Sequence, residues 1–136
     1  MTLPITATLA AFLGLLALPL TIYVSLQRAS VGKSVGELTA AAFGPHSDVR
    51  LTAIIRAHGN FMEYTPFALI MFGLIELNGA PNPLFWSLGL AFVAGRYLHA
   101  FAMLTNPYPP ALRGIAMITT YAAMIVPTIY LGLQLI

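Results

Sequence analysis

The chain has 136 residues, of which 59% are hydrophobic and only 7% are charged. Soluble domains contain about 25% charged residues, so six basic and four acidic side chains could not cover the surface of a soluble fold. The net charge of +2 is too small for a phosphate-binding surface. The absence of cysteine excludes disulfides, thiolate nucleophiles and cysteine-ligated zinc. These observations exclude an ordinary soluble domain, a disordered chain and a nucleic-acid-binding protein.

Four apolar stretches are long enough to cross a bilayer, which requires about 20 residues each. The first stretch is uncharged, and because the first basic residue is Arg28, it lacks the basic start of a cleaved signal peptide. The third contains Arg96 and His99, and the fourth is uncharged from Ile115 onward. We predict an all-α membrane protein, a four-transmembrane-helix bundle in a single domain over residues 1–136. Its helices are expected at about residues 3–27, 48–78, 83–104 and 112–135.

Basic residues predict how the helices are oriented in the membrane. Arg28, Lys33 and Arg50 flank the first loop, and Arg113 follows the third loop. The second loop and both termini carry no basic residue. Because basic loops stay in the cytoplasm, we expect the first and third loops there and both termini on the opposite, non-cytoplasmic side.

Polar residues within the helices gather toward the predicted cytoplasmic side. A charge at the centre of a span costs about 2.5–3.5 kcal/mol on insertion scales, so such residues usually have a function. Arg56, Asn60 and Glu63 are spaced i, i+4 and i+7 and share one face of the second helix. Tyr64 lies beside this face, and His58 points away from it. A guanidinium, an amide and a carboxylate on one face suit a zwitterionic ligand with carboxylates and an amine.

The stretch RAHGNFMEYTP, residues 56–66, resembles the second-helix motif of the MAPEG family, the membrane-associated proteins in eicosanoid and glutathione metabolism. The stretches ELNGA and GRYLHA that follow it resemble the short bacterial inner-membrane members. The resemblance implies a homotrimer in the lipid bilayer, with glutathione as co-substrate bound between neighbouring subunits near the cytoplasmic side. A glutathione transferase or peroxidase of this kind would act on a small lipophilic electrophile.

Carried over position by position, the resemblance also implies individual roles at a glutathione site. Arg113 would be the catalytic residue, because a cation near the sulfur stabilises the thiolate, which is the nucleophile. No metal is implied. The residues that would bind glutathione are Arg28, Arg56, Asn60, Glu63, Tyr64 and His99.

The third helix departs from the best-known family enzymes, which often carry tyrosines at the glutathione site. His99 and Met103 stand at those positions, and the adjacent Tyr97 faces elsewhere. This departure favours an alternative, in which the protein is a non-catalytic accessory or structural subunit of a larger membrane complex. A further alternative is a haem- or quinone-binding electron carrier, which rests only on His58 and His99 lying at similar depths on neighbouring helices.

Several polar residues also have a purely structural interpretation. Asn60 and Glu63 could bridge helices in a packed bundle. His58 is expected to make a structural hydrogen bond, since it points away from the polar face. Glu76, near the outer end of the second helix, is expected to be a helix-end residue or a contact between subunits rather than a catalytic acid.

Overall fold

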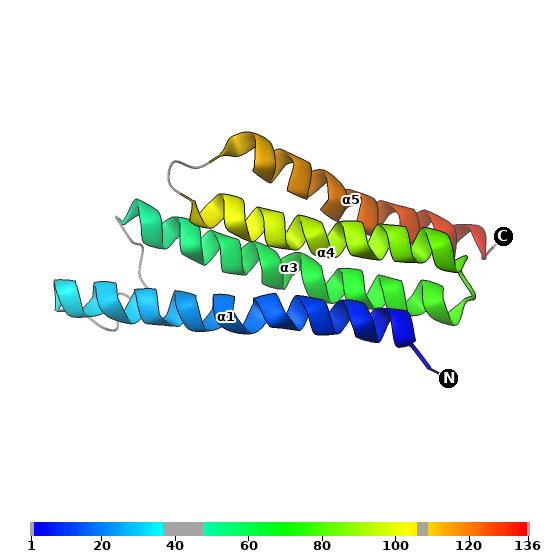
Figure 1. Cartoon of the computed structure of the whole chain (residues 1–136), viewed down its shortest axis with the longest axis horizontal. Coiled ribbons are helices and arrows are strands. Elements are labelled where there is room, and N and C mark those ends of the chain that lie inside the picture. The colour runs from blue at the N-terminus through cyan, green and yellow to red at the C-terminus, as the bar shows by residue number, and fades with distance from the viewer. Residues whose placement is uncertain (1, 37–47, 106–108, 136) are drawn as a thin grey trace.

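Four helices form an elongated bundle, which confirms the predicted all-α fold class (Figure 1). The computed structural model describes residues 2–36, 48–105 and 109–135, so most of the first loop and part of the third lie outside the described residues. The helices are α1 (Pro4–Val35), α3 (Val49–Leu77), α4 (Asn82–Leu104) and α5 (Pro110–Leu133).

Three of these helices, α1, α4 and α5, are long and apolar enough to cross a membrane. Helix α3 is comparable in length, with 29 residues, but carries Arg56 and Glu63 in its interior. A charged residue within a span is costly unless it faces protein or water. The helices that pack around α3 therefore decide what Arg56 and Glu63 face.

Helix α1 is longer than its apolar run predicts. Instead of ending near residue 27, it continues to Val35 and ends at Gly36, which adopts a left-handed conformation with φ of 73°. Helical hydrogen bonds do not require apolar side chains, so the helix continues until a residue suited to the left-handed cap is reached. Arg28 and Lys33 therefore lie on a helix rather than in a loop. The other helices begin and end within two residues of the expected bounds.

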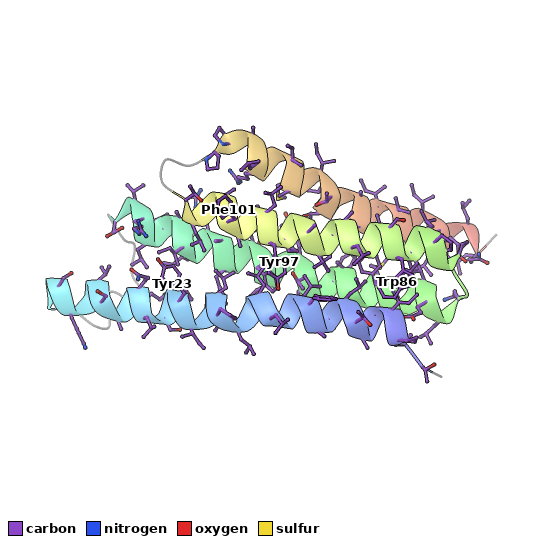
Figure 2. The ribbon with its side chains drawn as sticks, in the orientation of Figure 1. Tyr23, Trp86, Tyr97 and Phe101 are labelled. Atoms are coloured by element: carbon purple, nitrogen blue, oxygen red, sulfur yellow. The ribbon has the colours of Figure 1, made fainter. Side chains whose placement is uncertain are left out.

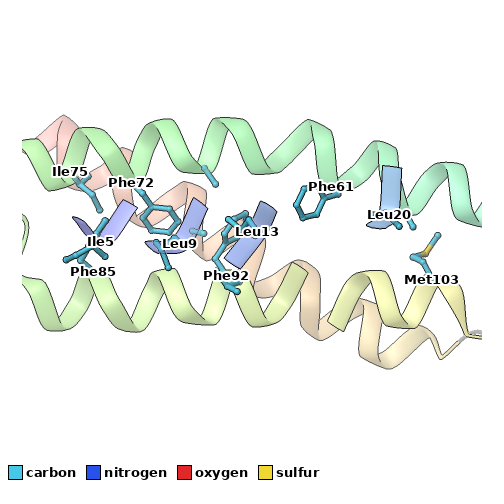
Figure 3. Packing of buried hydrophobic residues seen from close by; sticks show 14 residues of the cluster. Ile5, Leu9, Leu13, Leu20, Phe61, Phe72, Ile75, Phe85, Phe92 and Met103 are labelled. Atoms are coloured by element: carbon cyan, nitrogen blue, oxygen red, sulfur yellow. The ribbon is translucent and has the colours of Figure 1, made fainter. Parts of the chain in front are cut away.

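Helices α3 and α4 occupy the centre of the bundle. Helix α1 packs on α3 and α4 from one side, and α5 packs on the same pair from the other (Figure 1). Among the described residues, α1 and α5 make no contact. The core between the helices includes three aromatic rings, with Phe72 edge-on to Phe85 at 5.4 Å between centroids and tilted against Phe92 at 6.0 Å (Figure 3).

The outer surface of the bundle is apolar as well. Leu15 and Leu18 of α1 are 67% and 69% exposed, and Ile118 of α5 is 67% exposed. Side chains project outward along these helices (Figure 2). A helix that is apolar all round is typical of a membrane span, so the outer face is suited to lipid.

The start of α1 and the end of α5 lie at one end of the bundle, and the end of α1 and the start of α5 lie at the other (Figure 1). That other end carries Arg28, Lys33, Arg50 and Arg113, because α1 finishes there and α3 and α5 begin there. The structure thus places these basic residues together, as the loop assignment predicts. We refer to this end of the bundle below as the basic end.

At the end of the bundle near the termini, Glu76 fixes the start of α1. Its carboxylate accepts hydrogen bonds from the backbone N–H groups of Ile5 and Thr6, both at 2.9 Å, and from the Thr6 hydroxyl at 2.7 Å. The first N–H groups of a helix have no partner within the helix, and a negative charge is favourable beside them. Glu76 is a helix-end residue, as expected, and its contact is with α1 of the same chain.

Replacing Glu76 with alanine should therefore destabilise the bundle. Losing a helix N-cap costs about 0.5–2 kcal/mol, so we expect a lower midpoint of thermal unfolding in detergent, with Glu76→Gln intermediate because one acceptor oxygen remains. Asn78→Ala is the control, since the Asn78 side chain bonds only to the backbone of its own helix. Equal midpoints for Glu76→Ala and Asn78→Ala would contradict the capping role.

Candidate functional site

A cavity of about 320 Å³ opens between α3, α4 and α5 in the half of the bundle toward the basic end. Small-molecule sites occupy about 300–1,000 Å³, so its size suits a small ligand. It is lined by Ile55, Arg56, Gly59, Asn60, Glu63, His99, Met103 and Arg113. Five of the seven residues predicted to bind or act on glutathione therefore line one cavity, although they come from three helices.

The charged groups of this cavity are accessible. Arg56 and Glu63 are exposed on α3, and Arg113 is exposed on α5. No acid of the described residues forms an ion pair with either arginine. The cavity thus presents two guanidinium groups and one carboxylate whose charges are not neutralised within the described part of the chain.

The buried guanidinium of Arg96 holds the wall of the cavity, a role that the sequence pattern did not reveal. Arg96 is 1% exposed. Its Nη1 donates to Asn60 Oδ1 at 2.8 Å, and its Nη2 donates to Thr120 Oγ1 at 2.5 Å. The guanidinium also lies 5.9 Å from the ring centre of Tyr64. One residue of α4 therefore connects α3 with α5 by side-chain hydrogen bonds.

A close approach of α4 to α5 brings Thr120 within reach of Arg96. At Gly95, an added Cβ would collide with the side chain of Thr119 and come within 3.3 Å of the Ala116 carbonyl oxygen. Small residues at such positions allow the backbones of membrane helices to approach. The Thr120 hydroxyl donates in turn to the Ala116 carbonyl at 3.0 Å, so its oxygen is oriented to accept from Arg96.

The bond from Arg96 also sets the orientation of the Asn60 amide. Only the carbonyl oxygen of an asparagine can accept a hydrogen bond from a guanidinium, so the Asn60 NH₂ group points away from Arg96. That nitrogen lies 4.0 Å from Met117 Sδ, a weak acceptor. Asn60 lines the cavity, and because its oxygen is bonded to Arg96, the amide can offer a ligand its NH₂ group.

His99 is buried in the cavity wall with an unsatisfied nitrogen. The residue is 2% exposed, and its Nε2 has no hydrogen-bond partner among the described residues. A buried polar atom left without a partner costs about 1–3 kcal/mol. A ligand that reached this nitrogen would remove that cost, which makes His99 a strong candidate for a ligand contact.

Two of the predicted residues do not line this cavity. Tyr64 is half-buried, with its ring against Arg96 rather than at the cavity surface. Arg28 is half-buried on α1, and α1 packs on the side of α3 and α4 that is away from α5. Within one chain, therefore, neither side chain joins the five residues that the structure brings together.

Two aromatic side chains outside the polar face make contacts with α1. His58 Nε2 lies 3.0 Å from the Thr21 hydroxyl, which confirms the expected structural hydrogen bond. Tyr97 donates to the Phe12 carbonyl oxygen at 2.8 Å and, as expected, faces away from the cavity; Figure 2 marks its position. His58 faces α1 whereas His99 lines the cavity beside α5, so the two histidines on which the electron-carrier alternative rests do not share one site.

Comparisons with known proteins agree with this architecture. The sequence model of the MAPEG family matches residues 6–133. Inner membrane protein YecN of Escherichia coli (strain K12) is 35% identical over 60 residues, which are 44% of this chain and 46% of YecN. YecN of Escherichia coli O6:H1 (strain CFT073) matches to the same extent. The chain thus aligns with about half the length of these relatives, and no solved structure gives a significant match.

The family match covers α3, α4 and α5, all but the first two residues of α1, and every lining residue of the cavity. Three of those helices are apolar enough to cross a membrane. The chain is therefore an integral membrane protein that belongs to the MAPEG family.

Proposed function

We propose that this protein is a glutathione transferase or peroxidase that acts on lipophilic electrophiles within the membrane. The observation that carries the proposal is the set of side chains lining the cavity between α3, α4 and α5, namely two arginines, a glutamate, an asparagine and a buried histidine. Glutathione, with two carboxylates, an ammonium group and two peptide bonds, matches this set in charge and in hydrogen-bonding capacity.

Each polar group of the cavity has a counterpart in the ligand. Arg56 binds a carboxylate, because a guanidinium offers paired N–H donors to two oxygens. Glu63 accepts from the ammonium group, and the NH₂ group of Asn60 donates to a peptide carbonyl. His99 Nε2 supplies one further hydrogen bond. These contacts involve groups of glutathione that do not change during the reaction, so they position the thiol.

Arg113 is then the residue that supports the chemistry. A free thiol has a pKa near 8.5 and is mostly protonated at neutral pH, so a nearby guanidinium increases the fraction of thiolate. The thiolate attacks an electrophilic carbon, and the electron pair displaced onto the co-substrate takes a proton from water. With a hydroperoxide, the thiolate attacks the terminal oxygen and breaks the O–O bond, which gives a sulfenic acid on glutathione and an alkoxide that takes a proton from water to become an alcohol. The thiol of a second glutathione then displaces the hydroxyl group of the sulfenic acid, which forms the disulfide and releases water.

The exposed charges of α3 and α5 favour association with a further copy of the chain, and we propose the homotrimer that the family resemblance implies. Arg56, Glu63 and Arg113 are exposed in a single chain, and a charge facing the bilayer core costs about 2.5–3.5 kcal/mol on insertion scales. A neighbouring copy that covers the cavity removes this cost and would bring its own first helix, with Arg28, toward the ligand.

Native mass spectrometry in mild detergent should give the mass of a complex of three copies of the chain. A stable monomer would contradict the shared site.

We also propose an inner-membrane location with the basic end in the cytoplasm and both termini outside. The basic residues lie at one end of the bundle (Figure 1), basic segments stay in the cytoplasm, and the related YecN is named an inner membrane protein.

The orientation can be tested with single introduced cysteines, because the chain itself has no cysteine. Lys33→Cys should react with an impermeant maleimide only after permeabilisation, whereas Leu135→Cys should react in intact cells. The reverse pattern would invert the topology.

The presence of methionine at position 103 favours a second candidate function, that of a non-catalytic subunit of a larger membrane complex. Met103 lines the cavity at a position where the best-known family enzymes often carry tyrosine. A thioether is at most a weak acceptor and cannot donate a hydrogen bond. Glutathione binding without turnover on any electrophile would support this second candidate.

Variants of the cavity residues should separate binding from chemistry. Arg56→Ala and Glu63→Ala should each weaken glutathione binding about 30-fold or more, because removing one partner of a desolvated charged pair costs about 2–5 kcal/mol. Arg113→Ala should lower kcat more than affinity, since negative charge develops at the sulfur in the transition state. Calorimetric titration and steady-state rates measure both effects.

His58→Ala serves as the control for these variants, because His58 contacts α1 and not the cavity. Its affinity for glutathione should remain close to that of the parent protein. If His58→Ala abolished binding while Arg56→Ala left it intact, the assignment of the cavity as the glutathione site would be wrong.

Arg96 should act on glutathione binding through Asn60. Arg96→Lys should weaken binding about tenfold, because an ammonium cannot bond Asn60 and Thr120 with the geometry of the guanidinium. If Arg96 works by orienting Asn60, adding Asn60→Ala to Arg96→Lys should cause little further loss of affinity. A double variant whose losses are fully additive would show that Arg96 has no positioning role at Asn60.

A further inference from the structure

A second cavity lies at the basic end, between the start of α3 and the end of α4. It measures about 450 Å³ and is bounded by the first turns of α3, including Arg50 and Ala53, and by residues 103–105 at the end of α4. Arg50 is its one charged lining residue among the described residues. Arg50 is exposed and forms no ion pair with a described acid, so its charge is available to an anion.

An apolar groove along α1 shares one lining residue with this cavity. The groove measures about 650 Å³, is lined by six residues of α1 between Leu16 and Leu26, and also includes Leu104. Leu104 lines the cavity as well, so the groove and the cavity adjoin the same side chain. Figure 2 marks Tyr23, one of the α1 residues of the groove, and Figure 3 shows Leu20 at the same end of the bundle as Met103.

The length of the groove matches one leaflet of a membrane. At 1.5 Å per residue, the helix from Leu16 to Leu26 rises about 15 Å, which is half of a hydrocarbon core of about 30 Å. The groove borders the outer face of α1, where Ile22 and Leu26 are 59% and 62% exposed. A single acyl chain that entered from the surrounding lipid could therefore lie along it from the middle of the membrane to the headgroup region.

We propose that the groove and the second cavity together bind one anionic phospholipid, with an acyl chain along α1 and the headgroup phosphate at Arg50. The charge of the site is complementary to such a lipid, because the groove is apolar and Arg50, the second residue of α3, stands at the helix end, where headgroups lie. Basic pockets between membrane helices are suited to anionic headgroups. A zwitterionic lipid is bound less well, since its own ammonium group offsets the phosphate charge.

This lipid site is separate from the proposed glutathione site and does not depend on it. The two cavities share Met103 as a lining residue, but their other lining residues differ, and the groove along α1 shares no residue with the glutathione cavity. A chain that bound no glutathione would still present the groove, Arg50 and Leu104. The test of the lipid site therefore reads out bound lipid and not enzymatic activity.

Native mass spectrometry of protein exchanged into equal amounts of phosphatidylglycerol and phosphatidylethanolamine tests the proposal. The parent protein should retain phosphatidylglycerol in preference, and Arg50→Gln should reduce that preference about fivefold. Ala53→Trp should abolish retention, because the indole fills the cavity. Lys33→Gln removes an exposed charge from the same end of the bundle, and Ala91→Trp adds an indole at an exposed position of α4, so both should behave as the parent.

Three outcomes would overturn the proposal. The first is a parent protein with no preference between the two phospholipids, and the second is an Arg50→Gln variant that keeps the parent's preference. The third is displacement of phosphatidylglycerol by an equal concentration of oleate, which would assign the site to a free fatty acid. Since Arg50→Gln changes an exposed side chain, its result stands even if Ala53→Trp fails to fold.

Discussion

The buried guanidinium of Arg96 is the constraint on which the polar half of this bundle depends. A charge in the interior of a membrane bundle must be given acceptors, and the described acceptors come from two other helices, Asn60 of α3 and Thr120 of α5. Those bonds turn the polar face of α3 toward α5 and fix the Asn60 amide. The cavity with Arg56, Glu63, His99 and Arg113 lies directly beside this network. The same interaction thus stabilises three helices and orients one side of the site.

The two sides of the central α3–α4 pair have different surroundings. On the α5 side, a polar cavity collects charges that the described chain does not neutralise. On the α1 side, contacts are mostly apolar, with Glu76 fixing the start of α1 at one end and an apolar groove toward the other. Because α1 and α5 do not touch among the described residues, the proposed glutathione site and the groove along α1 lie on different sides of the pair. A peptide-sized zwitterion suits the first side and an acyl chain suits the second.

The sequence predicts the parts of this arrangement that depend on a single helix. Apolar runs locate the four helices, and the i, i+4, i+7 spacing correctly places Arg56, Asn60 and Glu63 on one cavity and His58 off it. Contacts between helices are less accessible to such patterns. Nothing in the spacing shows that Arg96 reaches Thr120, which requires the close approach at Gly95. Nor does the local sequence of α1 reveal that Glu76, about seventy residues away, supplies its N-terminal acceptor.

We propose that the cavity recognises glutathione through the charges of the peptide rather than through its sulfur. Calorimetric titration of the purified protein with glutathione, with S-methylglutathione and with a glutathione diester measures this directly. Binding of glutathione and of S-methylglutathione should be comparable, whereas the diester, which lacks both carboxylates, should bind at least about 30-fold more weakly. Equal affinity for glutathione and its diester would contradict the account, because Arg56 would then have no carboxylate to bind.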